Sequence, residues 1–227
     1  MTKSIFLRGS ATVLLCVSLS ACLGNGNNGT AGGGTAGGGT GSGGSGGTPS
    51  QSDFDANIAR VEGIAPSSTK QSGTFDYAGQ VRLSTRDANA NVNGELLGDV
   101  AATVNYDAET ATGNVTNIAG TVDGAAVAFD GTLDTSTGAG SGTVVAATTN
   151  APIVGSVTST VVGLTVEGTL TESGGTDTAQ VVLGLNGPTL GTNAEAIRGG
   201  AVAASTTFNG QQGINGIGAG DFYLDKQ

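Results

Sequence analysis

The sequence has no histidine and no tryptophan, and its only cysteines, Cys16 and Cys22, lie close to the amino terminus. Without histidine, the Ser-His and Cys-His nucleophile systems cannot form, and the commonest ligand of transition metals is missing. The carboxylates do not make up for this, because they are scattered singly rather than gathered as a catalytic or metal site requires. We therefore expect no enzyme, no catalytic residue, no cofactor and no metal site.

Positive charge is also scarce. Eight lysines and arginines stand against 18 aspartates and glutamates, which gives a formal net charge of −10. This balance argues against nucleic acid as a partner and against a basic patch that binds anionic lipid. Isolated acids such as Asp76, Asp99, Glu167 and Asp221 fall mostly on the polar faces of expected strands, so we interpret them as solvated surface.

The first residues have the layout of a secretory signal peptide. Lys3 and Arg8 precede an apolar run over residues 11–19, which is too short to span a bilayer. The sequence Leu-Ser-Ala-Cys at 19–22 then resembles the bacterial lipobox. In that family the chain is cut before the cysteine, which carries a diacylglycerol on sulfur and an acyl chain such as palmitate on nitrogen. We expect residues 1–21 to be removed and Cys22 to be lipidated; the alternative is an ordinary signal peptide followed by a cysteine.

A glycine-rich segment follows the expected anchor. From Leu23 to Ser50 there are 14 glycines and no charged or aromatic residue, so nothing offsets the entropy of ordering this stretch. We expect residues 22–52 to form a flexible linker with an end-to-end distance of roughly 30 Å. Leu23 stands where an inner-membrane retention signal commonly has Asp. The resemblance to lipoproteins therefore implies the outer membrane, with the cell surface favoured over the periplasmic face.

A short amphipathic helix is predicted over residues 53–62. Its apolar residues Phe54, Ile58 and Val61 are spaced at i, i+4 and i+7, with Ser52 or Asp53 as the N-cap and glycine 63 as the stop. Together with the lead-in to residue 72, we expect this helix to close one end of the following domain.

Residues 73–227 carry the signature of many short strands. Alternating apolar and polar residues, separated by glycine-rich turns, predict strands at 74–83, 96–106, 114–119, 127–134, 142–147, 164–170, 179–185, 201–208 and 219–224. We expect an all-β fold, a single antiparallel soluble β-barrel of eight or nine strands, with a sandwich as the alternative. A membrane barrel is disfavoured because 3 tyrosines and 6 phenylalanines are too few for two aromatic girdles. The many small interior residues indicate a filled barrel.

Two turns share the pattern Asp-x-x-Thr-x-x-Gly, at 107–113 and 134–140. We expect each aspartate to accept hydrogen bonds from backbone amides two residues on, and each final glycine to adopt a positive φ. Calcium binding by these acids is the weaker alternative, since the spacing matches neither an EF-hand loop nor a nonapeptide calcium loop.

The stretch Gly-Thr-Asn-Ala-Glu-Ala-Ile-Arg-Gly-Gly at 191–200 resembles the Gly-Pro-Asn-Ala-Glu-Glu-Leu-Gly-Gly stretch of transferrin-binding protein B and related surface lipoproteins. In that family a short helical turn leads into a late strand of a β-barrel. The matching positions are Gly191, Asn193, Ala194, Glu195, Gly199 and Gly200. The chain departs from the pattern at Thr192, Ala196 and Arg198. Physically, we expect Asn193 to cap the turn and the glycines to let the backbone bend.

The resemblance implies the fold and the lipoprotein character, but not transferrin as the ligand. The expected function is a non-catalytic binding module, whose loops at the barrel mouth contact a host protein, a nutrient or solute carrier, or a receptor. One alternative is a structural envelope lipoprotein without a ligand. Another is a haem- or haemoglobin-binding relative, which would have to use Tyr77, Tyr106 or Tyr223 as its iron ligand.

Overall fold

The computed structural model describes residues 49–87, 89, 91–151, 155–208, 211–212 and 217–227. The predicted signal peptide, Cys22 and all but the last residues of the predicted linker lie outside this part of the chain. Within the described residues no helix is both long enough and apolar enough to cross a membrane.

The described chain forms one helix and a series of antiparallel strands. These are α1 (Gln51–Glu62), β1 (Thr74–Arg86), β2 (Val92–Asn105), β3 (Thr110–Val122), β4 (Ala125–Asp130), β5 (Leu133–Asp134), β6 (Ser141–Ala151), β7 (Gly155–Glu172), β8 (Thr178–Leu190), β9 (Ala196–Phe208), β10 (Gln211–Gln212) and β11 (Ile217–Lys226). The prediction of a mostly antiparallel β fold with one short helix is confirmed. Eight of the nine predicted strand positions each fall on one strand, although most strands are longer than predicted. The prediction at 127–134 is wrong in part, because the chain leaves the strand at Gly131 and Thr132 and forms β4 and β5 instead.

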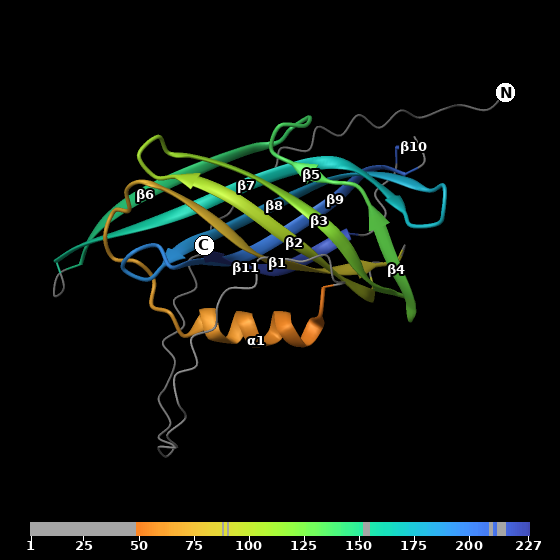
Figure 1. Cartoon of the computed structure of the whole chain (residues 1–227), viewed down its shortest axis with the longest axis horizontal. Coiled ribbons are helices and arrows are strands. Elements are labelled where there is room, and N and C mark those ends of the chain that lie inside the picture. The colour runs from red at the N-terminus through yellow and green to blue at the C-terminus, as the bar shows by residue number, and fades with distance from the viewer. Residues whose placement is uncertain (1–48, 88, 90, 152–154, 209–210, 213–216) are drawn as a thin grey trace, which may run out of the picture. The chain divides into compact units, whose positions relative to one another are not determined.

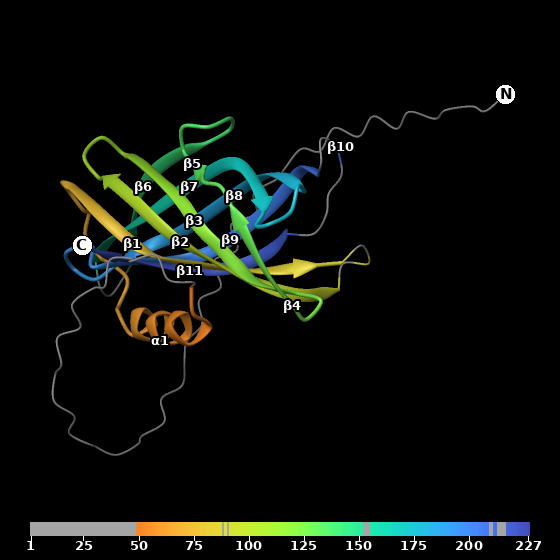
Figure 2. The ribbon, with the colours of Figure 1, turned by 45° about the vertical axis from the view of Figure 1, so that its right-hand side comes forward.

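The strands pair into a ring of eight. Neighbours in the chain pair from β1 to β3 and from β7 to β9, β9 pairs with β11, and β11 pairs with β1. The place between β3 and β7 is shared by β4, β5 and β6, each of which pairs with both. Figures 1 and 2 show the long strands crossing obliquely around a common interior.

Apolar side chains fill the inside of this ring. On β1 the residues Tyr77, Val81 and Leu83 are buried, while their neighbours in sequence face outward. The same alternation along the other strands joins 26 buried residues in one cluster that includes Val104, Leu133, Leu183 and Phe222. The interior is therefore a packed core of the kind the small, alternating residues predicted.

Helix α1 lies against the outer wall of the ring and not across its end, which corrects the expectation from sequence. Phe54, Ile58 and Val61 are buried as predicted, but against outward-facing residues of four strands: Leu97, Leu190, Ala196 and Tyr223. The helix begins two residues earlier than predicted, with Ser50 at the N-cap, and ends at Gly63 as expected.

Three ion pairs between α1 and the wall flank this apolar contact. Arg82 of β1 donates to Asp55 of α1 at 2.8 Å and holds Asp221 of β11 through two bonds of 3.0 Å. Its guanidinium also lies 4.6 Å from the centre of the Phe54 ring. Arg60 pairs with Asp225, and Glu62 with Arg198. The helix is thus fixed to the wall by apolar packing along its length and by charges at its sides.

The two similar turns differ in structure. Asp134 accepts from the backbone N–H of Ser136 at 2.8 Å, as predicted. In the other turn that role belongs to Asn105, which accepts from the amides at 107 and 108. The positive φ values occur at Glu109 and Gly138, not at the glycines 113 and 140, so that part of the prediction is wrong. Both of these glycines instead lie where a Cβ would meet neighbouring backbone at 2.7 Å or less.

Candidate functional site

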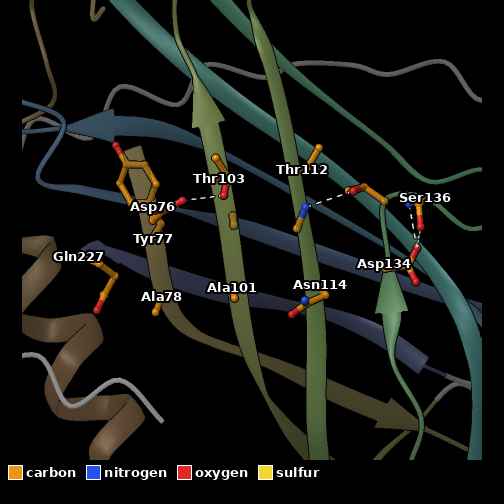
Figure 3. A pocket seen from close by; sticks show the side chains of 13 residues that line it. Asp76, Tyr77, Ala78, Ala101, Thr103, Thr112, Asn114, Asp134, Ser136 and Gln227 are labelled. Carbon is orange, nitrogen blue, oxygen red and sulfur yellow. Dashed lines mark hydrogen bonds between the residues drawn. The ribbon is translucent and has the colours of Figure 1, made fainter. Parts of the chain in front are cut away.

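Two hollows lie on the outer wall of the ring. We call the first the Asp76 hollow; its volume is about 550 Å³, and it is lined by Asp76, Tyr77, Ala78, Ala101, Ala102, Thr103, Thr112, Gly113, Asn114, Asp134, Thr135, Ser136 and Gln227. Its floor is formed by adjacent positions of β1, β2 and β3, and its rim by the turn after β5 and the carboxyl terminus (Figure 3).

The polar groups of the Asp76 hollow are largely paired with one another. Thr103 donates its hydroxyl to Asp76 at 2.7 Å, and the hydroxyl of Ser136 donates to Asp134 at 2.7 Å (Figure 3). The hydrogen bonds from Ser136 lower the pKa of Asp134 below its usual value. The hollow therefore presents carboxylates that already have donors, which suits surface recognition better than proton transfer.

The second hollow, which we call the helix-side hollow, has a volume of about 680 Å³. It lies beside the start of α1 and is lined by Pro49, Gln51, Glu95, Leu97, Ala119, Gly120, Thr121, Ala126, Val127, Ala128, Glu172 and Ser173. Small apolar side chains from β2, β3 and β4 make up much of the lining, and two glutamates stand among them. Burial raises the pKa of Glu95, an effect that the nearby charge of Arg82 opposes.

The acids considered from sequence do not come together. Asp76, Asp99 and Asp221 lie apart on the outer wall and bind Thr103, Gln80 and Arg82 respectively. Among the residues that the structure describes, no three acids, cysteines or histidines gather closely enough to hold a metal ion.

Glu167 is the exception to the prediction of solvated acids, because its residue is only 7% exposed. The loop after β5 covers it. Its carboxylate accepts from the backbone N–H of Ala139 at 2.5 Å and from the side chain of Gln180 at 2.6 Å. Glu167 therefore fastens the loop to the wall. The alternation of apolar and polar residues in β7 correctly predicts that the Glu167 side chain faces outward. That the loop after β5 covers this side chain can be seen only in the fold.

The three tyrosines are all buried. The hydroxyl of Tyr77 donates its proton to the carbonyl oxygen of Ala194 at 2.9 Å. The hydroxyls of Tyr77 and Tyr106 also lie 2.9 Å apart, and because Tyr77 has already used its only proton, Tyr106 is the donor in this second bond. Tyr106 in turn contacts the hydroxyl of Thr189 at 3.2 Å. Tyr223 packs under α1, with its ring 5.6 Å from that of Phe54. The hydroxyls of Tyr77 and Tyr106 thus link β1 to the turn at Ala194 and to Thr189 of β8. These contacts fit a role in packing.

The stretch 191–200 forms a tight turn and the start of β9. Residues 191–194 are turn rather than helix, with positive φ at Gly191 and Ala194. The carboxylate of Glu195 accepts from the backbone N–H of Asn193 at 3.3 Å, so Glu195 and not Asn193 caps the turn. Ala194 is fully buried and supplies the carbonyl that binds Tyr77. This stretch is therefore a structural element of the ring's end.

The paired glycines of this stretch differ in what they do. A Cβ at Gly199 would lie 1.9 Å from the carbonyl oxygen of Asn186, so only glycine allows β8 and β9 to approach here. A Cβ at Gly200 would meet nothing within 4 Å. Of these two glycines, only Gly199 is therefore required for the close approach of the strands in the wall.

Comparisons of the chain with protein-family models, with curated proteins and with solved structures found no match. The geometry of the described residues is therefore the basis for the functional proposal.

Proposed function

We propose that this chain is a lipid-anchored protein of the bacterial outer membrane, held through Cys22 on a flexible linker, and that it acts as a non-catalytic binding module. In this proposal the ring of strands is a soluble β-barrel like those of transferrin-binding protein B and its relatives. The module binds a protein partner through its outer surface. A host protein, a nutrient carrier and an envelope receptor are the classes of partner that fit this arrangement.

The observation that carries the proposal is the packed interior of the ring. Tyr77, Leu133, Leu183, Phe222 and their neighbours occupy the space in which a barrel would otherwise hold a ligand. A partner must therefore meet the outside of the ring, either at its loops or at the wall, where both hollows lie. Outward-facing polar residues and an inward-facing apolar core also favour a barrel in water over one in lipid.

The charges favour a partner with a basic surface. All 18 acids of the chain fall within residues 49–227, against six basic residues there, because Lys3 and Arg8 precede them. Of these six, four arginines and lysines pair with acids, and Lys226 donates to the carbonyl of Asn193 while covering the Phe75 ring. The sixth, Arg86, also has a partner. The surface thus keeps an excess of unneutralised carboxylates, which attract cationic surfaces.

The anchor is tested by two serine variants. We expect the wild-type chain and Cys16→Ser to incorporate labelled palmitate and to sediment with membranes. Cys22→Ser should do neither, because it removes the acylated sulfur. Label in Cys22→Ser, or its absence from the wild type, would contradict the anchor. Protease treatment of intact cells then distinguishes the cell surface from the periplasmic face.

The binding role is tested by capture on the immobilised chain from envelope fractions and from host fluids, under several nutrient conditions. We expect a defined basic partner whose capture weakens as salt rises, since the Debye length falls from about 10 Å at 0.1 M to about 3 Å at 1 M. A variant in which acids of the outer wall are changed to the corresponding amides tests the role of charge. It should no longer capture the partner. Failure to recover any salt-sensitive partner would favour the structural alternative.

A further inference from the structure

The hairpin of β6 and β7 projects beyond the ring. The two strands pair at eleven consecutive positions, from Ser141↔Thr165 to Ala151↔Gly155. However, β3 pairs with β6 only at Thr143, and β8 joins β7 only from Val161 onward. We call residues 145–151 and 155–160 the β6–β7 arm. It appears in Figure 1 as the green ribbon that extends past the other strands at the left.

One edge of the β6–β7 arm is open. The backbone N–H of Val144 points away from β7, because it donates to the carbonyl of Glu109 at 3.1 Å. In an antiparallel pair, alternate residues point their backbone groups to the same side. The N–H and C=O groups of Ala146, Thr148 and Asn150 therefore also point away from β7, and no strand in the described part of the chain pairs with them.

This edge lacks the features that normally prevent pairing. Proteins protect open edges with charged side chains, proline or bulges. Here no charged residue occurs between Asp134 and Glu167, and β6 contains no proline, since Pro152 comes only after its last residue. The register of β6 with β7 also continues without a bulge. Val145 on the outer face is 60% exposed. By contrast, the short open stretch of β4 lies between Asp123 and Asp130.

The charge pattern indicates which partner fits the edge. The chain is strongly acidic, so two copies repel each other over most of their surfaces. The β6–β7 arm carries no charge, and pairing it with its own copy brings no like charges into contact. A ribbon of two strands is also marginal on its own, whereas two such ribbons joined at their edges make a four-stranded sheet.

We propose that the open edge of β6 pairs antiparallel with the same edge of a second copy of this chain. The contact is two-fold symmetric, with Ala146, Thr148 and Asn150 of each copy facing the other. The inference rests on the β6–β7 arm alone and is independent of the anchor and of the proposed partner.

The test compares two matched lysine substitutions in the full chain with Cys16 and Cys22 changed to serine. Val145→Lys places a charge beside the open edge. Val202→Lys places the same charge on a valine of similar exposure, 65%, on β9, where β8 and β11 pair with both edges. Mass is measured by light scattering and sedimentation over a concentration series. Circular dichroism and thermal midpoints show that both variants fold.

We expect the parent chain and Val202→Lys to dimerise with the same dissociation constant, and Val145→Lys to weaken the dimer at least about tenfold. Thr149→Lys, on the same face of the arm, should weaken the dimer in the same way. It replaces Val145→Lys in the test if that variant does not fold. A parent chain that stays monomeric throughout the series overturns the proposal. So does equal weakening by Val202→Lys, or a dimer that neither arm variant affects. Capture of an extended peptide by a monomeric parent would assign the edge to a different partner and reject the second copy.

Discussion

Alkaline titration of the tyrosines offers a direct check of the packed ring. The chain has three tyrosines and no tryptophan, so phenolate absorbance reports on these residues alone. Burial raises the pKa of Tyr223 to about 12, although a hydrogen bond with Asn57 opposes the shift. Burial also raises the pKa values of Tyr77 and Tyr106. No tyrosine of the folded chain should ionise at its ordinary pKa of 10.0.

The same shifts make stability depend on pH in a definite direction. Above pH 10 the unfolded tyrosines lose their protons while the folded ones keep theirs, so the free energy of unfolding falls as pH rises. Below pH 10 the tyrosines are protonated in both states, so their full contribution to the free energy of unfolding is present. Each tyrosine removes about 1.4 kcal/mol per pH unit, or about 4 kcal/mol per unit for all three. A domain with an ordinary stability of about 5–15 kcal/mol should therefore unfold roughly one to four units above pH 10, with a smaller slope above pH 12, where Tyr223 also ionises in the folded chain.

The assay follows phenolate absorbance and circular dichroism together as the pH is raised. We expect absorbance to stay flat through pH 10 and then to rise in one step with the loss of strand signal. The chain in denaturant, where all three tyrosines should titrate near pH 10, is the reference. A gradual rise centred near pH 10 with the strand signal intact would show that the tyrosines are exposed, and would refute the packing described above.

Three substitutions and one matched control, Gly200→Ala, test other parts of the structure through denaturant unfolding. Phe54→Ala should lower stability by about 3–5 kcal/mol, since it removes the largest anchor of α1; a loss below about 1 kcal/mol would mean that the helix is not docked. Gly199→Ala should cost more than about 2 kcal/mol because its Cβ meets backbone, whereas Gly200→Ala, in open space, should stay within about 0.5 kcal/mol. Equal effects would contradict the close approach of β8 and β9. Tyr77→Phe should cost about 1–3 kcal/mol by leaving the carbonyl of Ala194 without its donor, and an unchanged midpoint would reject that bond.

The parts of the fold that depend on local alternation could be predicted from the sequence. Period two locates every long strand, and the spacing of Phe54, Ile58 and Val61 locates the helix and its buried face. Strand lengths were underestimated because polar threonines and asparagines continue the ladders after the apolar residues end, as in β6 and β7.

Properties that depend on distant residues could not be predicted in this way. The seat of α1 on the wall requires Leu97, Leu190 and Tyr223 to form one outward patch, which only the ring assembles. The burial of Glu167 depends on a loop that begins some thirty positions earlier in the chain. The capping of the turn at 191–194 by Glu195 rather than Asn193 depends on backbone angles that the residue types alone do not fix.

The pairing of β1 with β11 has a consequence for how the protein forms. The first strand of the ring finds one of its two neighbours only in the last strand, from Tyr77↔Lys226 to Thr85↔Ile217. A chain that is still being synthesised or transported cannot close its core until β11 has emerged. The order of the sequence thus delays folding until β11 is available. A truncation of about ten residues at the carboxyl terminus should leave an open, unprotected sheet.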